Sequence, residues 1–434
     1  MGRATRGHRA SLDREPSGGE VPLKPLPSPL LERLAQLAML GATAHGIDRR
    51  LFSEADAGAR GLFAQWARAA NYAVEQDRAG NVFARRAGLR AGAAVLSGSH
   101  LDTVPTGGPY DGAYGAVAAL CALEELDAAG ILTEHPVEAV AWAGEEASRF
   151  PLGCLGSGAF AGLNDLASID LLRDENGVSF AAARAAAHGL LPGVPVRDTF
   201  PAPAGYVELH IEQGPVLEHG GVRLGIVTAI AGQARFDVEV HGESGHAGTV
   251  PMGLRRDALS SAAELVLELE AAAADIGEAV LTVGRLVVFP NQANVIPGRV
   301  ALRVDARSVD EMRLTALRTA VVECAERVAA QRSVRIETTL IEERRAVVMD
   351  RRLRLAVAEA IAELGEAAID VPSGAGHDAM CLAAVAPAAM IFVPSAGGRS
   401  HVGNEYTAPA DLQLGVTALT RSIAAIDRLL AKDS

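Results

Sequence analysis

Cysteine is scarce in this chain of 434 residues, and its four cysteines are widely separated in the sequence. Cys121, Cys154, Cys324 and Cys381 include no CxxC pair, so the chain has neither a disulfide framework nor a thiolate zinc site. Cys121 and Cys324 fall in apolar helical patterns, and we interpret them as buried hydrophobic side chains. This use of cysteine favours a reducing compartment, the cytoplasm.

The chain also lacks long apolar runs and a surplus of positive charge. No apolar run approaches the roughly 20 residues needed to cross a bilayer, so we predict no membrane span. The formal net charge is −13 at pH 7. Nucleic acid is therefore not an expected partner, because binding phosphates requires a basic face. Residues 1–29 lack the apolar region of a signal peptide and are interpreted as a disordered N-terminal extension.

The chain does contain many short apolar segments. Residues 93–96, 137–143 and 388–393 are each nearly continuous in apolar side chains, which predicts buried strands, and residues 206–211 are predicted as a further strand. Because they alternate with helical patterns, they indicate an α/β fold. A chain of this length exceeds the size at which one hydrophobic core usually stops growing, so two domains are expected.

A different pattern occupies residues 226–341. Residues 235–241 alternate apolar and polar side chains, as a half-exposed antiparallel strand does. With two amphipathic helices and further strands, this stretch predicts a compact α+β unit with helices on one face of its sheet. We therefore predict a discontinuous outer domain, residues 30–225 and 342–434, with residues 226–341 inserted into it.

The first chemical signal lies at residues 97–115. A buried strand delivers His100 and Asp102 at its carboxyl end, and a Gly-rich loop brings Asp111 back towards them. In open α/β sheets, ligands bind in the crevice at the carboxyl ends of the strands. A histidine and an aspartate in this arrangement are well placed to bind a metal ion.

Other candidate ligands also follow predicted strands. Glu145 and Glu146 end one strand, His210 ends another, and His401 comes late in the chain. Imidazole and carboxylate ligands without thiolates suit Zn²⁺, and also Mn²⁺, Co²⁺ or Ni²⁺. Two neighbouring cations need a negative bridge, which a carboxylate supplies. Of two adjacent glutamates, one can bind a metal while the other takes the proton from water.

Eight short segments carry a resemblance to a known family. They include Glu145-Glu-Ala-Ser-Arg-Phe150 and Glu208-Leu-His-Ile-Glu-Gln-Gly-Pro215, and the full set lies at residues 98–104, 108–112, 145–150, 208–215, 245–252, 294–298, 373–379 and 400–407. Together they resemble the hydantoinase/carbamoylase family of amidases. That family includes N-carbamoyl-L-amino acid hydrolases, allantoate amidohydrolases and β-ureidopropionase-like enzymes. The resemblance runs in order from about residue 30 to the C-terminus.

The resemblance implies a metallo-aminopeptidase-like catalytic domain with a mixed sheet, and an inserted lid and dimerisation domain. It implies two divalent metal ions per subunit, with Zn²⁺ as the first choice and Mn²⁺, Co²⁺ or Ni²⁺ as alternatives. One ion would be bound by His100 and His210, the second by Glu146 and His401, with Asp111 as the bridge.

The resemblance also assigns roles to residues around the metals. Glu145 would be the general base. Asp102 would orient His100, a function that metal-bound imidazoles usually require. His377 and Asp378, in a Gly-rich loop, are interpreted as supporting or helix-capping residues rather than as ligands.

Substrate contacts follow from the resemblance as well. Arg307 would bind a substrate carboxylate with its planar fork, and His246 would donate to the oxyanion of the tetrahedral intermediate. Gln213 and Asn294 would face the substrate, and the loop at Gly376 would offer backbone N–H groups. Arg307, His246 and Asn294 lie in the inserted segment, so a hinge would have to bring them to the metals.

Two of these assignments leave alternatives open. Arg307 could pair with Asp305 or Asp310 instead of a substrate. His246 could act in its own subunit or, in the homodimer that the resemblance implies, in the neighbouring one.

The leading hypothesis is a metal-dependent amidohydrolase that cleaves a linear C–N bond of a ureido compound bearing a carboxylate. An N-carbamoyl-L-amino acid would give the amino acid, CO₂ and ammonia. Allantoate amidohydrolase is the first alternative. An aminopeptidase, an N-acyl-amino acid deacylase and an inactive metal-binding module are more distant alternatives. Val402-Gly403 replaces the family's usual Asn-Pro, and Arg399 replaces a common apolar residue, so the substrate stays open.

Overall fold

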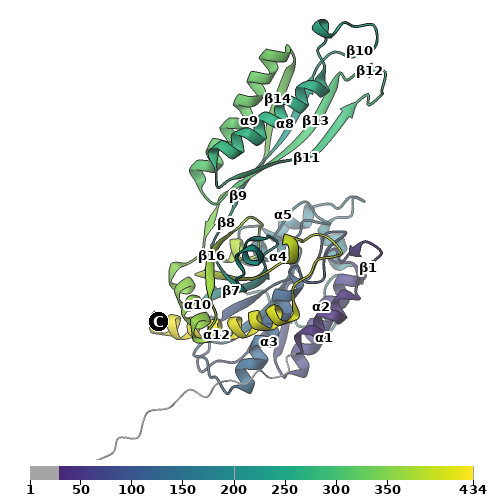
Figure 1. Ribbon diagram of the computed structural model, residues 1–434. Coiled ribbons are helices and arrows are strands. Elements are labelled where there is room, and N and C mark those ends of the chain that lie inside the picture. Colours follow the sequence, from purple (N-terminus) through teal and green to yellow (C-terminus); the bar gives the residue numbers. More distant parts are fainter. Residues whose placement is uncertain (1–28, 200, 434) are drawn as a thin grey trace, which may run out of the picture.

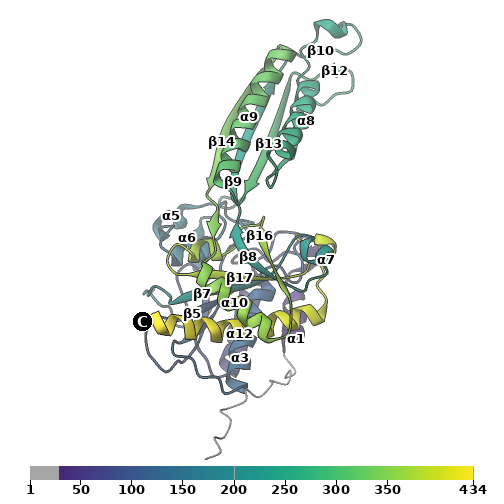
Figure 2. The same ribbon diagram turned by 60° about the vertical axis from the view of Figure 1, so that its left-hand side comes forward.

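The computed structural model describes residues 29–199 and 201–433. Residues 1–28 of the predicted N-terminal extension therefore lie outside the described residues. Two sheets dominate the structure, one of nine strands and one of four. The nine-stranded sheet and its helices form a broad body, from which the four-stranded sheet projects at one end (Figures 1 and 2).

The nine-stranded sheet runs in the order β15-β8-β17-β7-β5-β6-β4-β3, with β16 paired to β8. Its four central strands, β17, β7, β5 and β6, are mutually parallel, and every residue in them is buried. Helices cover both faces of a parallel sheet, which explains this burial. Polar side chains at the ends of β5 and β7, including Ser99 and His210, are buried with the apolar ones. The strands are β3 (Ala73–Gln76), β4 (Val82–Arg86), β5 (Val95–His100), β6 (Val137–Trp142), β7 (Gly205–Ile211), β8 (Leu224–Ile230), β15 (Val347–Val348), β16 (Ala368–Ser373) and β17 (Ala388–Val393).

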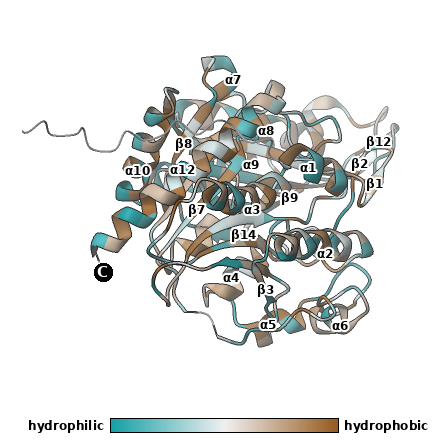
Figure 3. Ribbon diagram, turned by 90° about the horizontal axis from the view of Figure 1, so that it is seen from below, coloured by the Kyte–Doolittle hydropathy of each residue, from teal (hydrophilic) through white to brown (hydrophobic). Residues whose placement is uncertain are grey.

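Helices cover the two faces of this sheet unequally. Long helices form one core with it: α1 (Leu30–Ala38), α2 (Glu54–Ala69), α3 (Ala113–Ala128), α10 (Arg351–Glu363) and α12 (Pro409–Asp433). Short helices contribute to the core on the opposite face: α4 (Leu155–Phe160), α7 (Val216–Gly220) and α11 (Ala379–Leu382). Two more short helices, α5 (Leu166–Leu171) and α6 (Phe180–Ala185), pack at the edge. Figure 3 shows apolar residues along the helices and strands of this interior.

Helix α3 lies directly behind the predicted ligand loop, and its small side chains let it approach the sheet closely. A Cβ at Gly115 would lie 2.2 Å from the carbonyl oxygen of Leu209 in β7, so a larger residue does not fit there. This close packing fixes the loop that precedes α3 against the ends of β5 and β7. Within the described part of the chain, none of the helices is long and apolar enough to span a membrane.

The four-stranded sheet is antiparallel, in the order β11-β13-β9-β14. In β9, Phe236, Val238 and Val240 are buried beneath the helices, and the residues between them face outward, as the alternating sequence predicts. The sheet and its two helices have a hydrophobic core of their own. The elements are β9 (Gly232–His241), α8 (Ala258–Ile276), β11 (Val280–Phe289), β13 (Arg299–Ser308), α9 (Glu311–Arg332) and β14 (Arg335–Arg344).

The chain enters the smaller sheet directly from the larger one. Strand β8 ends at Ile230 and β9 begins at Gly232, while the return path follows Arg344. At the far end, β10 (Gly245–His246) pairs with β12 (Val295–Ile296). In the body, a second small ribbon joins β1 (Ala42–Thr43) and β2 (Gly46–Ile47).

Candidate metal centre

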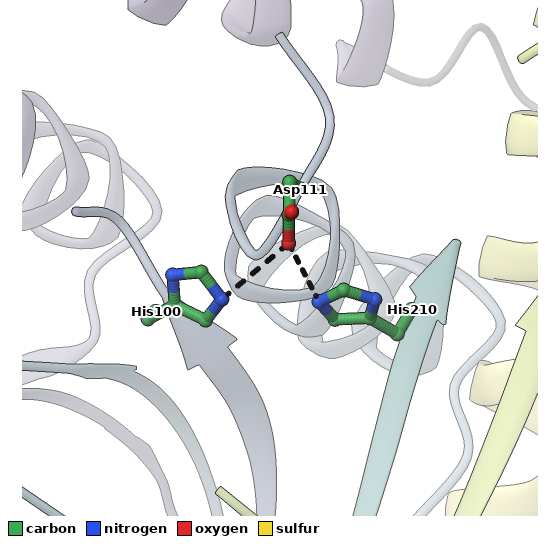
Figure 4. A group of neighbouring side chains, drawn as sticks. All are labelled: His100, Asp111 and His210. Atoms are coloured by element: carbon green, nitrogen blue, oxygen red, sulfur yellow. Dashed lines mark ion pairs between the residues drawn. The ribbon is translucent and has the colours of Figure 1, made fainter. Parts of the chain in front are cut away.

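The ends of two adjacent parallel strands bring the first ligand group together. His100 is the last residue of β5, His210 lies near the end of β7, and Asp111 lies on the loop that leads into α3. Asp111 Oδ1 is 3.6 Å from His100 Nε2 and 3.4 Å from His210 Nε2. All three side chains are buried and point towards one another (Figure 4).

The second ligand group uses the other oxygen of the same aspartate. Asp111 Oδ2 is 3.2 Å from His401 Nε2, which in turn is 3.4 Å from Glu146 Oε2. The two groups therefore share the Asp111 carboxylate, with one oxygen facing each. The structure thus gathers all five predicted ligands in the arrangement that a bridging carboxylate requires.

Two of the imidazoles are oriented by backbone carbonyl groups. His100 Nδ1 lies 2.9 Å from the carbonyl oxygen of Asp102, and His210 Nδ1 lies 2.9 Å from that of Ile211. Because a carbonyl oxygen only accepts, each Nδ1 carries the proton and each Nε2 presents a lone pair to the site. The N–H of Gly112 donates to that lone pair on His210, at 3.1 Å.

Asp102 contacts His100 as predicted, but through its backbone carbonyl, and its carboxylate has another function. It accepts the backbone N–H groups of Gly144, Glu145 and Glu146, at 3.0, 3.1 and 3.3 Å. Its Oδ1 lies 3.8 Å from His100 Nδ1, so the Asp102 carbonyl rather than its carboxylate holds the imidazole. The carboxylate instead fixes the loop that carries the two glutamates.

The electrostatics of the site fit a divalent cation. Burial, then the neighbouring charges of Glu146, Asp378 and Asp102, raise the pKa of Glu145 well above its usual range. Burial and the charge of Asp111 raise the pKa of Glu146 to about 8. Glu146 Oε1 is also buried without a hydrogen-bond partner among the described residues. Metal ions would supply the missing positive charge, because a bound cation reverses this repulsion.

Residues for which the sequence suggested no role hold the bridging aspartate. Glu405 is buried and accepts the backbone N–H groups of Tyr110 and Asp111, at 2.9 and 3.0 Å. The hydroxyl of Ser400 lies 2.9 Å from Asp111 Oδ2 and 2.7 Å from Glu405 Oε2. Gln213, predicted to face the substrate, donates from Nε2 to Asp111 Oδ2 at 2.8 Å. The one sequence signal for Ser400 and Glu405 was their place in the motif at 400–407.

One cavity is lined by all five ligands together with Glu145, Gln213, Gly376 and Arg307. Arg307 reaches it from β13 in the smaller sheet. Its Nε donates to Asp305 at 2.8 Å and its Nη1 to the carbonyl of Gly374 at 2.7 Å. The structure therefore combines the two interpretations that the sequence left open, since Arg307 lines the cavity and also pairs with Asp305.

His246 and Asn294 do not reach this cavity in the same chain. They adjoin one another at the far end of the smaller sheet, where the N–H of Ala247 donates to the carbonyl of Asn294 at 3.0 Å. Gln233 of β9 lines the cavity, and His241 ends the same strand. At about 3.3 Å per residue along the strand, Gln233 and His241 are about 25 Å apart. Figures 1 and 2 show β10 and β12 beyond that end, away from the body.

His377 and Asp378 adjoin the predicted ligands, and His377 also lines the cavity. The His377 ring packs on His210 with 4.6 Å between ring centroids, and its Nε2 lies 2.9 Å from the hydroxyl of Ser373. Asp378 accepts from the hydroxyl of Ser157 in α4 at 2.5 Å.

Comparisons with known proteins agree with this architecture. The family model described as Peptidase family M20/M25/M40 matches residues 96–425. The N-carbamoyl-L-amino acid amidohydrolase of Geobacillus stearothermophilus is 37% identical over 403 residues, which cover 91% of this chain and 97% of that protein. The allantoate amidohydrolase of Bacillus subtilis (strain 168) is 40% identical over 346 residues, covering 79% and 84%.

A solved structure extends the similarity to three dimensions. The amidase of the hydantoinase/carbamoylase family from Burkholderia multivorans superposes with a TM-score of 0.85 at 37% identity, covering 92% of this chain and 97% of that one. The predicted mixed-sheet fold and the predicted class, a metal-dependent hydrolase, are confirmed. The chain belongs to peptidase family M20/M25/M40 and, within it, to the hydantoinase/carbamoylase amidases.

Proposed function

We propose that this protein hydrolyses the ureido C–N bond of an N-carbamoyl-L-amino acid, giving the amino acid, CO₂ and ammonia. The observation that carries the proposal is the shared carboxylate of Asp111, with Glu145 and Arg307 lining the same cavity. An N-carbamoyl-amino acid has a ureido group, which would face the metal ligands and Glu145, and a carboxylate, which would face Arg307. The N-carbamoyl-L-amino acid amidohydrolase similar to this chain supports that choice.

The cofactor of the proposed enzyme is a pair of divalent ions in each subunit. His100 and His210 would hold one ion, Glu146 and His401 the other, and Asp111 would bridge them. The donor set of nitrogen and oxygen suits Zn²⁺ first, and also Mn²⁺, Co²⁺ or Ni²⁺. When bound, such ions lower the pKa of water and polarise a carbonyl group.

Glu145 acts as the general base and then as the general acid. Its Oε2 lies 3.9 Å from His100 Nε2, so one carboxylate oxygen faces the ligand group while the side chain lines the cavity. Placed there, it takes a proton from the attacking water and returns it to the leaving nitrogen.

The substrate carboxylate binds at Arg307. Its Nε and Nη2 point to Asp305, and Nη1 donates to the Gly374 carbonyl, which fixes the guanidinium at the edge of the cavity. Each Nη carries a second hydrogen that is available to a carboxylate. Gln213 and the backbone at Gly376 contact the rest of the substrate.

His246 and Asn294 act, in this proposal, in the neighbouring subunit of a homodimer. Closure within one chain would have to carry them over about 25 Å, the length of β9 beyond the cavity. A second copy that lays its smaller sheet against the first needs no such movement. His246 would then donate to the oxyanion of the partner's substrate.

The cytoplasm is the proposed location. No disulfide links the cysteines of the described residues, which suits a reducing compartment. The substrates are small molecules, and nucleic acid remains an unexpected partner for a chain with a net charge of −13.

Allantoate is the second candidate substrate, favoured by the 40% identity to an allantoate amidohydrolase. It also carries a ureido nitrogen and a carboxylate, so the same residues would bind it. Dipeptides and N-acyl-amino acids are more distant candidates, since they lack the ureido group. The presence of Glu145 beside the complete ligand set argues against an inactive metal-binding module.

A substrate panel tests the proposal. The purified protein, loaded separately with Zn²⁺, Mn²⁺ and Co²⁺, is assayed on N-carbamoyl-L-amino acids, allantoate, dipeptides and N-acetyl-amino acids. We expect kcat/KM for an N-carbamoyl-L-amino acid to exceed every other class by at least about 10-fold, as expected when buried polar groups recognise the ureido group. Turnover of dipeptides alone would contradict the proposal, and a preference for allantoate would establish the second candidate.

A further inference from the structure

The carboxylate of Glu145 is held by a thiol. Cys154 Sγ lies 3.3 Å from Glu145 Oε1, and among the described residues no other side chain or backbone group donates a hydrogen bond to this carboxylate. The second oxygen, Oε2, is the one that faces His100. The two oxygens of the general base therefore have different surroundings, a thiol on one and the ligand group on the other.

The backbone around Cys154 places its side chain for this contact. The N–H of Cys154 donates to the carbonyl oxygen of Glu145 at 2.9 Å, so residues 145 and 154 are joined by both backbone and side chain. Cys154 has φ of +49°, in the left-handed region that residues other than glycine seldom adopt. Such conformations persist where the surrounding structure requires them, often at functional sites.

Cys154 occupies the N-cap of α4 but does not cap it. Ser, Thr, Asp and Asn are preferred at this position because their oxygens accept N–H groups of the first turn. No side-chain capping hydrogen bond is present here, and the thiol is directed to Glu145 instead. The requirements of helix α4 therefore do not account for this side chain.

The thiol also has a proton to donate. The neighbouring thiol of Cys381, burial and the charge of Glu145 raise the pKa of Cys154 well above the usual thiol value. Cys381 belongs to α11, which packs against α4, and its Sγ would lie 3.7 Å from a Cβ at Gly158. The other oxygen near Cys154 Sγ is the carbonyl of His377, at 3.6 Å, a longer contact than that to Glu145.

We propose that Cys154 is a positioning residue for the reaction: its S–H donates to Glu145 Oε1 and keeps Oε2 turned towards the metal ligands. This inference rests on the proposed function, in which Glu145 is the general base. The contribution of Cys154 lies in the orientation of a group that exchanges protons, so its loss should affect turnover more than substrate binding.

Kinetics of matched variants test the effect on turnover. Cys154→Ala removes the donor and Cys154→Ser keeps one, while Cys324→Ala removes a buried cysteine from the smaller sheet's core as a control. We expect Cys154→Ala to lower kcat by roughly 10-fold, the range for one hydrogen bond to a charged group, with KM within about twofold of wild type. Cys154→Ser should recover most of that loss, and Cys324→Ala should match wild type. Metal content measured for each variant must be equal.

A spectroscopic measurement tests the contact without any turnover. The infrared S–H stretching band of Cys154 is obtained in Zn²⁺-loaded protein without substrate, where Glu145 is ionised, as the difference between wild type and Cys154→Ala, or Cys154→Ser if the alanine variant does not fold. We expect this band to indicate a hydrogen-bonded thiol. In the Glu145→Gln background it should move to higher wavenumber, because an amide oxygen is a weaker acceptor than a carboxylate.

Two outcomes would overturn the inference: an S–H band that Glu145→Gln leaves unchanged, or a Cys154→Ala variant with wild-type kcat. A fall in activity that serine does not recover, or one accompanied by lost metal, would also count against it, since a purely structural role predicts that result. If the wild type hydrolyses a different substrate class, the proposed function fails while the S–H measurement and the variant kinetics on that substrate still decide the role of Cys154.

Discussion

The central strands of the nine-stranded sheet are buried on both faces, and two of them, β5 and β7, carry histidines at their ends. The four-stranded sheet is buried on one face only. Strand β7 is buried throughout and delivers His210 into a closed site. Strand β9 buries Phe236 and Val238 and exposes Asp237 between them. In the body, His100, Asp111 and His210 are buried, whereas the side chain of His401 is half exposed. The half-exposed sheet can instead carry charged groups at its two ends.

In the proposed function, the difference also separates the residues that would bind the metals from those that would contact the substrate. All five ligands belong to the body, while Arg307 and Gln233 enter the cavity from the near end of the smaller sheet. His246 lies at the far end of the same sheet. One sheet thus builds the metal centre, and the other presents groups to two places about 25 Å apart. The following predictions test this division.

The largest effect is expected from the shared carboxylate. Asp111→Asn keeps the shape of the side chain but removes the negative charge that both ligand groups use. We expect metal analysis to fall from about two ions per chain to below one, and kcat to fall by more than about 10³-fold, since both ions depend on the bridge.

Glu145→Gln is the matched control for this variant, because it alters the proposed base and none of the ligands. It should keep both metals and lose about 10²- to 10⁴-fold in kcat, the range for a general acid–base group. An Asp111→Asn protein with a full metal complement and wild-type turnover would remove the bridge from the mechanism.

A smaller loss is expected from the far end of the smaller sheet. His246→Ala should lower kcat by about 10²- to 10³-fold, as for loss of one oxyanion donor, without changing metal content. Mixing His246→Ala subunits with Glu145→Gln subunits should recover activity, because one site of each mixed dimer then has both groups intact. Recovery to about a quarter of wild-type activity is expected from equal, random mixing. Absence of any recovery would place His246 in its own subunit or outside catalysis.

A change at Arg307, at the end of the smaller sheet that meets the cavity, should weaken substrate binding more than turnover. Arg307→Lys removes the fork but keeps the charge, so we expect KM to rise by about 10-fold or more with little change in kcat. Arg303→Lys is the matched control, since Arg303 lies on the same strand and pairs with Asp237. Equal effects of the two substitutions on KM would show that Arg307 has no special role at the carboxylate.

The smallest effect on catalysis is expected from the two hydrophobic cores. Phe236→Ala and Phe392→Ala each remove a buried ring, from the smaller sheet and the body respectively, and should each cost about 3–5 kcal/mol of stability. Calorimetry of the metal-loaded protein should show that only Phe392→Ala weakens the stabilisation that metal provides. If Phe236→Ala reduces the metal-dependent stabilisation as much as Phe392→Ala does, the two cores unfold together. The body and the smaller sheet are then not independent in stability.

Several features of the site could be predicted from the sequence because they depend on strand ends. Parallel strands place their carboxyl ends at one edge, so His100, His210 and the two glutamates had to lie near one another once their strands were identified. The family resemblance then implied Asp111 as the bridge. Residue types determined the class of metal, since imidazole and carboxylate donors without thiolates select a limited set of ions.

Other features depended on backbone direction and could not be predicted. Asp102 orients His100 through its carbonyl and not its carboxylate, because the chain turns after β5 so that the carboxylate meets the N–H groups of the glutamate loop. Cys154 had no chemical signal in a stretch of small and apolar residues. Its side chain is directed by a left-handed backbone at residue 154, which the sequence does not reveal.

By itself, the sequence determined the family, the mixed-sheet fold, the candidate ligands and the proposed base, since these follow from short motifs and from the periodicity of buried strands. Only the tertiary structure decided the distances between them. His246 and Arg307 belong to the same inserted segment, yet one lies at the tip of the smaller sheet and the other in the cavity. The reason is that an antiparallel sheet extends its ends far apart, a separation that position in the sequence does not reveal.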